Sequence, residues 1–237
     1  MTETELRQKV VSTALAWLGT REYSAKHQEM LDIYNAQRPL PRGTRMLASW
    51  PWCAAFVSTV SLQCGLRNIM PTECGCPGMV RLYQELGRWV ENDAYTPSPG
   101  DVIFYDWQDS GVGDNAGQPD HVGIVASCNG QTMTIIEGNC DNAVKTRTLA
   151  VNARFIRGYG CPDYASRADG AEPTPTPAPT PTPEPEKPAE ATVDPFVTKT
   201  AREVIAGKWG NGQARKDALA AWFTKAVQDE VNRILGG

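Results

Sequence analysis

The chain has 237 residues, a formal net charge of −4 and 41% hydrophobic residues, which fits a globular protein with one sizeable core and a smaller second part. No basic block stands out, so nucleic acid is not an expected partner, and no apolar run approaches the roughly 18 residues of a membrane span. The start, Met1 to Glu5, is polar and acidic. We therefore expect no secretory signal peptide, and synthesis in the cytoplasm.

The cysteines are the next constraint. An odd count of seven leaves at least one thiol free in a monomer, and cytoplasmic synthesis predicts that most or all are thiols. Cys74-Gly75-Cys76 has a spacing seen in metal and redox sites. Because there is no second close pair of cysteines and only two histidines, we expect no structural zinc site, and no other metal or cofactor.

Composition divides the chain after Tyr164. Residues 166–193 consist mainly of Pro, Thr, Ala and Glu, and the alternating prolines prevent a helix and favour an extended polyproline II spacer. We expect a globular domain at 1–165, a linker at 166–193 and a small module at 194–237.

Four helices are predicted in the first part. Thr2 and Glu5 have the spacing of a capping box, and apolar residues recur at helical spacing as far as Leu18. Glycines mark helix ends and a proline marks a first turn. The expected helices cover residues 2–18, 28–35, 53–64 and 77–86.

Four strands are expected after the helices, at residues 102–105, 121–125, 132–136 and 155–159. Residues 128–130, Cys-Asn-Gly, are a hairpin signal between the second and third strands. Helices followed by an antiparallel sheet predict an α+β fold.

Cys53 is the candidate nucleophile because a helix is predicted to begin at this residue. The positive end of a helix lowers the pKa of a thiol, and the thiolate is the reactive form. A buried cysteine that only packs is the alternative, and it is the interpretation we give to Cys64. A cysteine nucleophile also needs a base. His121 opens a strand and is a better candidate than His27, which lies at a polar helix start.

A catalytic histidine needs a partner on its second nitrogen. Glu137 and Asn139 are the candidates. A three-residue hairpin loop at 128–130 places Glu137 directly opposite His121, with Asn139 as a diagonal neighbour on the same face. A two-residue loop would move Glu137 to the other face. The alternative is that both are ordinary polar residues at a strand end.

Four stretches, in this order and spacing, resemble the CHAP domain, the family of cysteine- and histidine-dependent amidohydrolases and peptidases. They are Trp52-Cys53-Ala54-Ala55-Phe56-Val57, Pro99-Gly100-Asp101-Val102-Ile103-Phe104, Asp120-His121-Val122-Gly123-Ile124-Val125 and Ile136-Glu137-Gly138-Asn139. The resemblance implies a papain-like fold and a site in which Cys53 is the nucleophile, His121 the base, and Glu137 and Asn139 complete the set. It also implies that the substrates are amide bonds of bacterial peptidoglycan. Residues 17–35 are similar to CHAP domains of phage endolysins.

Residues 106–115 are rich in oxygen ligands and glycine. Some CHAP enzymes bind calcium, but the spacing here does not match an EF-hand. The favoured interpretation is a polar loop at the rim of the active-site cleft, and calcium binding stays open.

The tail is expected to form three short helices, beginning at Asp194-Pro195. Residues 201–213, together with Arg215, resemble the CW-seven cell-wall-binding repeat of phage lysozymes. The resemblance implies a muropeptide ligand, with Lys208, Trp209 and Arg215 as the candidate contacts. The alternative for Trp209 is a structural role inside the helix bundle. A single copy is present, so the chain gains no avidity from repetition.

The sequence therefore predicts an endolysin-like peptidoglycan hydrolase, either an N-acetylmuramoyl-L-alanine amidase or an endopeptidase. One alternative is a wall-binding protein with an inactive CHAP domain, which the presence of Cys53 and His121 disfavours. The other is a cysteine protease acting on proteins, which the tail disfavours. The protein would reach the wall from the cytoplasm, as a phage or prophage enzyme, or act outside the cell. The oligomeric state stays open.

Overall fold

The computed structural model describes residues 1–92, 94–108 and 117–169. The chain divides into two units, Met1–Thr176 and Pro177–Gly237. The predicted three-helix module and nearly all of the predicted linker lie outside the described residues. Within the first unit, the described residues form four α-helices, two short 3-10 helices and a six-stranded antiparallel sheet, which confirms the predicted α+β class.

Several helix ends follow signals in the sequence. In α1 (Glu3–Leu15) the Thr2 hydroxyl accepts from the Glu5 N–H while the Glu5 carboxylate accepts from the Thr2 N–H, which is the predicted capping box. Gly65, with φ +73°, ends α3. The four α-helices are α1, α2 (Ala25–Ala36), α3 (Cys53–Cys64) and α4 (Cys76–Glu85). The prediction placed the end of α1 too late and the start of α2 too late.

The sheet has the strand order β1-β6-β2-β3-β4-β5. Its strands are β1 (Trp89–Val90), β2 (Val102–Tyr105), β3 (His121–Cys128), β4 (Thr132–Cys140), β5 (Ala143–Ala150) and β6 (Ile156–Gly160). The four predicted strands are confirmed, but β1 and β5 were not predicted. The short helices η1 (Pro41–Gly43) and η2 (Tyr164–Arg167) complete the elements.

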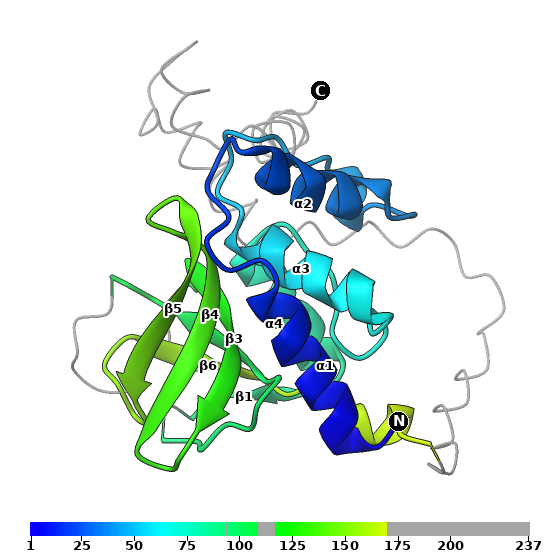
Figure 1. Ribbon diagram of the computed structural model, residues 1–237. Helices are drawn as coiled ribbons and strands as arrows, with labels where there is room; N and C mark the ends of the chain where they lie inside the picture. Colours follow the sequence, from blue (N-terminus) through cyan, green and yellow to red (C-terminus); the bar gives the residue numbers. More distant parts are fainter. Residues whose placement is uncertain (93, 109–116, 170–237) are drawn as a thin grey trace, which may run out of the picture. The chain divides into compact units, whose positions relative to one another are not determined.

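Helix α3 lies at the centre of the unit (Figure 1). It contacts α1 and α2 on one side and β3 and β4 on the other. Its residues are buried nearly all round, from Cys53 to Ser61, as expected for a helix that is apolar on every face. The start of α3 is therefore fixed against the sheet by the packing of the whole helix.

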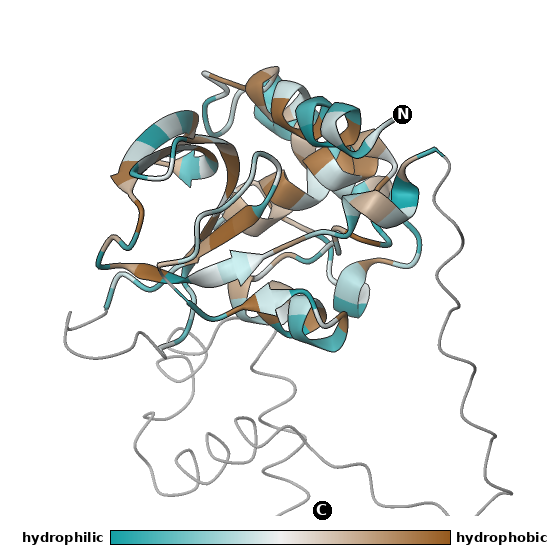
Figure 2. Cartoon of the chain, turned by 90° about the horizontal axis from the view of Figure 1, so that it is seen from below, coloured by the Kyte–Doolittle hydropathy of each residue, from teal (hydrophilic) through white to brown (hydrophobic). Residues whose placement is uncertain are grey.

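Successive side chains along the strands point alternately into two hydrophobic clusters, one on each face of the sheet. Val102, Phe104, Val122 and Ile124 join the helices in the main core, whereas a second cluster on the other face contains strand residues such as Val125. Figure 2 shows hydrophobic residues on the strands and on the helices that cover them. His121 belongs by its position to the second face, and it lies at the end of its strand.

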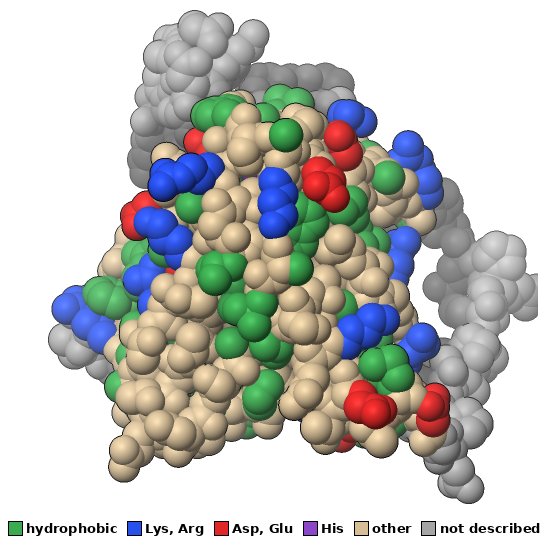
Figure 3. Space-filling view, viewed as in Figure 1, with side chains coloured by type: hydrophobic (Ala, Val, Ile, Leu, Met, Phe, Trp, Pro, Cys, Tyr) green, Lys and Arg blue, Asp and Glu red, His purple; other side chains and the backbone are tan. Residues whose placement is uncertain are grey.

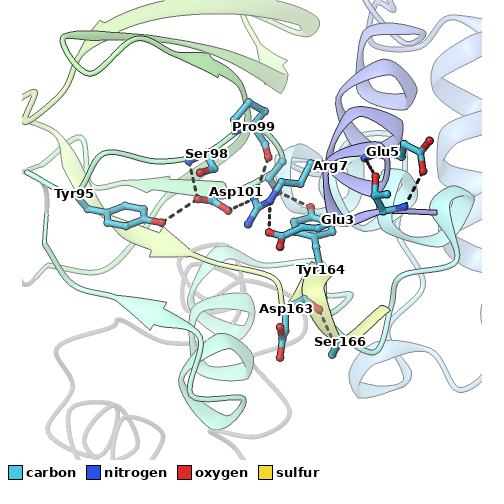
Figure 4. A network of polar contacts seen from close by, with 12 residues as sticks. Glu3, Glu5, Arg7, Tyr95, Ser98, Pro99, Asp101, Asp163, Tyr164 and Ser166 are labelled. Atoms are coloured by element: carbon cyan, nitrogen blue, oxygen red, sulfur yellow. Dashed lines mark hydrogen bonds and ion pairs between the residues drawn. The ribbon is translucent and has the colours of Figure 1, made fainter. Parts of the chain in front are cut away.

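The Pro99-Gly100-Asp101 stretch is tied to α1 (Figure 4). The Arg7 guanidinium donates to Asp101 Oδ1 at 2.9 Å and to the Pro99 carbonyl at 3.0 Å. The Tyr164 hydroxyl donates to the Gly100 carbonyl at 2.7 Å. A Cβ on Gly100 would lie 2.9 Å from that hydroxyl, so the turn requires glycine. Asp101 is fully buried, and its role in this part of the family motif is structural.

On the face shown in Figure 3, Lys and Arg side chains are dispersed among hydrophobic and acidic ones and do not gather in one patch. Among the described helices, none combines the length and the apolar character that crossing a membrane requires.

Candidate active site

Cys53 is the first residue of α3, as predicted. Its neighbour Trp52 occupies the N-cap and makes no side-chain hydrogen bond to the helix. The backbone N–H groups of the first turn therefore have no side-chain cap, and they concentrate positive charge around the thiol. The residue is 5% exposed, so Cys53 is buried.

His121 is the first residue of β3 and pairs with Tyr105 of β2. The two rings are stacked with centroids 5.7 Å apart. The Cys53 thiol and the His121 imidazole are close enough to shift each other's pKa in opposite directions. The structure therefore brings together the two residues that the sequence singled out.

The charges of this pair follow from its contacts. A hydrogen bond with Cys76 and the interaction with His121 outweigh burial, and they hold the pKa of the Cys53 thiol well below its ordinary value. Burial disfavours the imidazolium, but the interactions of the ring with Cys53 and Glu137 outweigh burial and raise the pKa of His121 to about 9. At neutral pH the pair is therefore a thiolate and an imidazolium.

Glu137 holds the other side of the imidazole. Its Oε2 lies 3.3 Å from His121 Nε2, and the side chain is fully buried. The prediction that Glu137 faces His121 is confirmed.

The predicted register of the hairpin is wrong, although the two side chains meet. Glu137 pairs with Gly123 and not with His121. Cys128 pairs with Met133, and the Asn129 N–H donates to the Thr132 carbonyl at 3.0 Å. The turn is therefore shorter than the three-residue loop expected at 128–130.

A β-bulge explains why the shorter turn does not send Glu137 to the other face. The register shifts between Val125 and Ser127, so one extra residue of β3 is accommodated there. A shift of one residue in the β3–β4 register changes which β4 side chains share a face of the sheet with His121. Because of the shift, Glu137 lies on the same face as His121. The sequence reasoning did not consider a bulge.

Gly123 provides the space for this contact. A Cβ at Gly123 would lie 2.9 Å from Glu137 Cγ and 2.5 Å from Ile135 Cγ2. Because glycine has no side chain, Glu137 can lean across β3 from the position opposite Gly123 to the imidazole of His121. The motif His121-Val122-Gly123 thus combines the imidazole with the space that its partner needs.

Arg147 on β5 is the site residue that the sequence reasoning missed. Its Nε donates to both carboxylate oxygens of Glu137, at 2.8 Å and 3.0 Å. Burial works against the charged carboxylate, but His121 and Arg147 together lower the pKa of Glu137 to about 2. Glu137 is therefore an anion between two cations.

The outer side of the site is aromatic. Trp107 stacks on Tyr105 with centroids 4.8 Å apart and an interplanar angle of 10°. The Arg147 guanidinium lies over the Trp107 ring, 5.1 Å from its centroid. Glu137 itself is fully buried, which strengthens its interaction with His121.

Asn139 is not brought into these contacts. It has a φ of +57° and lies beyond the Gly123–Glu137 pair at the end of the β3–β4 ladder, so the expected diagonal relation to His121 is not part of the observed pairing. Its side chain makes no hydrogen bond to another described residue. A catalytic role for Asn139 stays a prediction.

His27 is a histidine of the core. Its Nδ1 accepts from the Tyr23 N–H at 3.1 Å, and its ring lies 4.7 Å from the Trp52 ring. Burial lowers the pKa of His27, so the ring is neutral at physiological pH. The choice of His121 over His27 as the base stays a prediction.

All seven cysteines are free thiols, as expected. Cys76 opens α4 and its Sγ lies 3.7 Å from that of Cys53. Cys64 has its predicted packing role, with its Sγ 3.4 Å from Thr13 Oγ1.

In the described ranges, no group of three or more His, Cys, Asp or Glu side chains has the arrangement of a metal site. Most of the 106–115 loop falls outside those ranges, and so do Lys208, Trp209 and Arg215. At the start of the loop, Asp106 Oδ1 accepts from the Gln108 N–H at 2.9 Å.

Two family models match the chain. Residues 45–139 match the CHAP domain and residues 199–235 match the CW_7 repeat, so both resemblances are confirmed. The CHAP match spans the Cys53–His121–Glu137 cluster. No curated protein and no solved structure matches the chain. A CHAP domain indicates a cysteine- and histidine-dependent amidohydrolase or peptidase, and the CW_7 repeat indicates binding to the cell wall.

Proposed function

Because the chain joins a CHAP domain to a CW_7 repeat, we propose that it is an endolysin-like peptidoglycan hydrolase that cleaves an amide bond of the wall through Cys53. The bond is either the N-acetylmuramoyl-L-alanine linkage or a peptide bond of the stem or cross-bridge. The observation that carries the proposal is the contact of Cys53, at the positive end of α3, with an imidazole whose second nitrogen faces the buried carboxylate of Glu137.

The chemistry is acyl transfer. The Cys53 thiolate attacks the carbonyl carbon of the amide, and the developing oxyanion is stabilised by N–H groups at the start of α3. His121 donates its proton to the leaving amine, which departs and leaves a thioester on Cys53. The imidazole, now neutral, then accepts a proton from the water molecule that hydrolyses the thioester. His121 therefore serves as acid first and base second.

Glu137 and Arg147 act through His121. The Glu137 carboxylate orients the imidazole by its contact with Nε2, and it stabilises the imidazolium. Arg147 is a positioning residue, because its two hydrogen bonds hold both oxygens of the Glu137 carboxylate.

The tail delivers the enzyme to its substrate in this proposal. Residues 166–193 serve as a spacer between the catalytic domain at 1–165 and a wall-binding module at 194–237. The tail has 7 basic and 5 acidic side chains, which is too weak a charge for specific binding, so individual side chains must recognise the wall. Arg215 is suited to a two-pronged contact with a carboxylate, while Lys208 and Trp209 offer a charge and an apolar face.

Digestion of purified walls tests the proposal. The parent protein and the Cys53→Ala variant are incubated with peptidoglycan, and the released muropeptides are identified by mass spectrometry. The parent should release fragments with new amino termini, at alanine for an amidase or within the peptide for an endopeptidase, and Cys53→Ala should release none. Cys64→Ala, which removes another buried thiol of α3, is the matched control and should digest like the parent. Equal digestion by Cys53→Ala would contradict the proposal.

A further inference from the structure

We propose that Cys76 is a second redox-active thiol of the site, which forms a reversible disulfide with Cys53 after a peroxide has oxidised the Cys53 thiolate. The inference rests on the proposed function in one respect only, that Cys53 is a reactive thiolate. It adds a modification site, and with it a reversible off state, to the proposed enzyme.

Two helix starts bring the thiols together. Cys53 is the first residue of α3 and Cys76 is the first residue of α4. Their sulfurs are 3.7 Å apart and each side chain is 5% exposed. A disulfide bond is about 2.0 Å long, so the sulfurs must approach by less than about 2 Å, which is within reach of small side-chain rotations.

The other cysteines differ from this pair in their neighbours. Cys64 contacts the Thr13 hydroxyl, Cys140 accepts from Arg147 and Cys74 accepts from Arg42. Cys53 and Cys76 are the thiols that contact one another within the described residues. The Cys74-Gly75-Cys76 spacing therefore does not define the redox pair, because the partner of Cys76 comes from another helix.

The two thiols have different protonation states, which suits the two steps of the reaction. Contact with Cys53, together with burial, raises the pKa of Cys76 well above its ordinary value, so Cys76 stays a thiol and donates a hydrogen bond to the Cys53 thiolate. Because thiolates are the form that peroxides oxidise, Cys53 reacts first. Once Cys53 is a sulfenic acid, the negative charge that raised the pKa of Cys76 is gone, so Cys76 can give up its proton as its sulfur attacks.

The chemistry balances with hydrogen peroxide as the oxidant. In the first step the Cys53 thiolate attacks one peroxide oxygen, the O–O bond breaks, and the products are a sulfenic acid on Cys53 and hydroxide. In the second step the Cys76 sulfur attacks the Cys53 sulfur, an S–S bond forms and the S–O bond breaks. The hydroxyl group leaves with the Cys76 proton as water. A dithiol then restores both thiols and is itself oxidised to a disulfide.

The disulfide would have two consequences. Cys53 is blocked as a nucleophile while the bond exists, so hydrolysis stops under peroxide. The sulfenic acid is also removed before it reaches the sulfinic acid, which dithiols do not reduce. Without Cys76, the same exposure should inactivate Cys53 permanently.

Mapping of the oxidised protein gives the first test. The full chain is treated with hydrogen peroxide, its remaining thiols are blocked by alkylation, and it is digested without reductant for mass spectrometry. A linked peptide containing Cys53 and Cys76, which disappears with dithiothreitol, is the expected result. Accumulation of Cys53 sulfinic acid without the linked peptide would overturn the proposal.

Variants give the second test. The alkylation of Cys53 by iodoacetamide is measured before peroxide, after peroxide and after dithiothreitol, for the parent, Cys76→Ala, Cys76→Ser and the control Cys64→Ala. The parent and the control should recover most of their initial reactivity, whereas both Cys76 variants should recover little. Equal recovery in the Cys76 variants would refute the resolving role. Neither readout uses wall hydrolysis, so failure of the proposed function would appear separately, as a parent protein that forms the disulfide but digests no peptidoglycan.

Discussion

The two halves of the candidate site are built by different means. The position of Cys53 follows from local sequence signals, since helix α3 begins at Cys53 and Gly65 caps its end. The other half, with His121, Glu137 and Arg147, depends on pairing across β3, β4 and β5, and on a bulge between Val125 and Ser127. The comparison teaches that the position of the candidate nucleophile is specified by sequence neighbours, whereas the position of its proposed acid–base partner is specified by strand register.

Replacement of Glu137 by Gln tests the sheet half most strongly. The carboxylate stabilises the His121 imidazolium, so its loss should reduce kcat/KM by about 10³-fold, within the range for acid–base groups. Loss of a neighbouring anion also disfavours the imidazolium. The alkaline limb of the pH profile, expected at about 9 for the parent from the pKa of His121, should therefore move to lower pH.

Kinetics across pH on a soluble muropeptide would measure both effects. Thermal unfolding serves as the control for folding. If kcat/KM and the alkaline limb both remain at the parent values, the assignment of Glu137 is wrong.

Gly138→Ala tests how the two halves are joined. A Cβ at Gly138 would lie 2.4 Å from Phe56 Cβ of α3, so the variant should push α3 away from β4. We expect an overpacking cost of about 1–3 kcal/mol. We also expect a loss of activity of about 10²-fold, because a displacement of the order of 1 Å between reacting groups has such an effect.

Gly130→Ala is the matched control for Gly138→Ala. Gly130 has a φ of +87° and open space around its Cα, so alanine should destabilise the hairpin turn without displacing α3. Stability is followed by chemical denaturation and activity on soluble fragments. A Gly138→Ala variant that is destabilised but fully active would show that the contact between α3 and β4 does not set the geometry of the site.

Arg147→Met should have the smallest effect, a decrease in kcat/KM of about tenfold. Removal of the guanidinium takes a cation away from Glu137 and His121. The pKa of His121 should then rise, and the alkaline limb should move to higher pH, opposite to the shift for Glu137→Gln. Arg147→Lys retains the charge and should leave the limb near that of the parent. A limb that moves equally in both variants would argue against an electrostatic role for Arg147.

The sequence predicted the parts of the site that depend on local patterns. The start of α3 at Cys53 and the choice of His121 over His27 follow from helix and strand signals. The contact of Glu137 with His121 was predicted from the wrong register, because loop length alone does not reveal a bulge. Gly123 was a signal in the sequence for the close approach of Glu137, since a glycine within a strand indicates such an approach.

Arg147 was missed because β5 was missed. Asp141 and Asn142 have φ values of +46° and +57°, and Cys140 pairs with Ala143, which is a two-residue turn of the kind that Asn and Asp favour. That signal was present in the sequence. The contact of Cys76 with Cys53 was not predictable in the same way, because it requires the packing of two helices whose relative position no local pattern encodes.

The pH dependence of Cys53 alkylation tests the central claim most directly, because it reports on the thiolate–imidazolium pair without any substrate. The rate of modification of Cys53 by iodoacetamide is measured by peptide mass spectrometry across the pH range, with Cys64 as the internal comparison. The account predicts a midpoint for Cys53 well below the ~8.5 of a free thiol, and a slower reaction of Cys64, whose pKa is raised by burial. A midpoint for Cys53 at or above the free value would contradict the account.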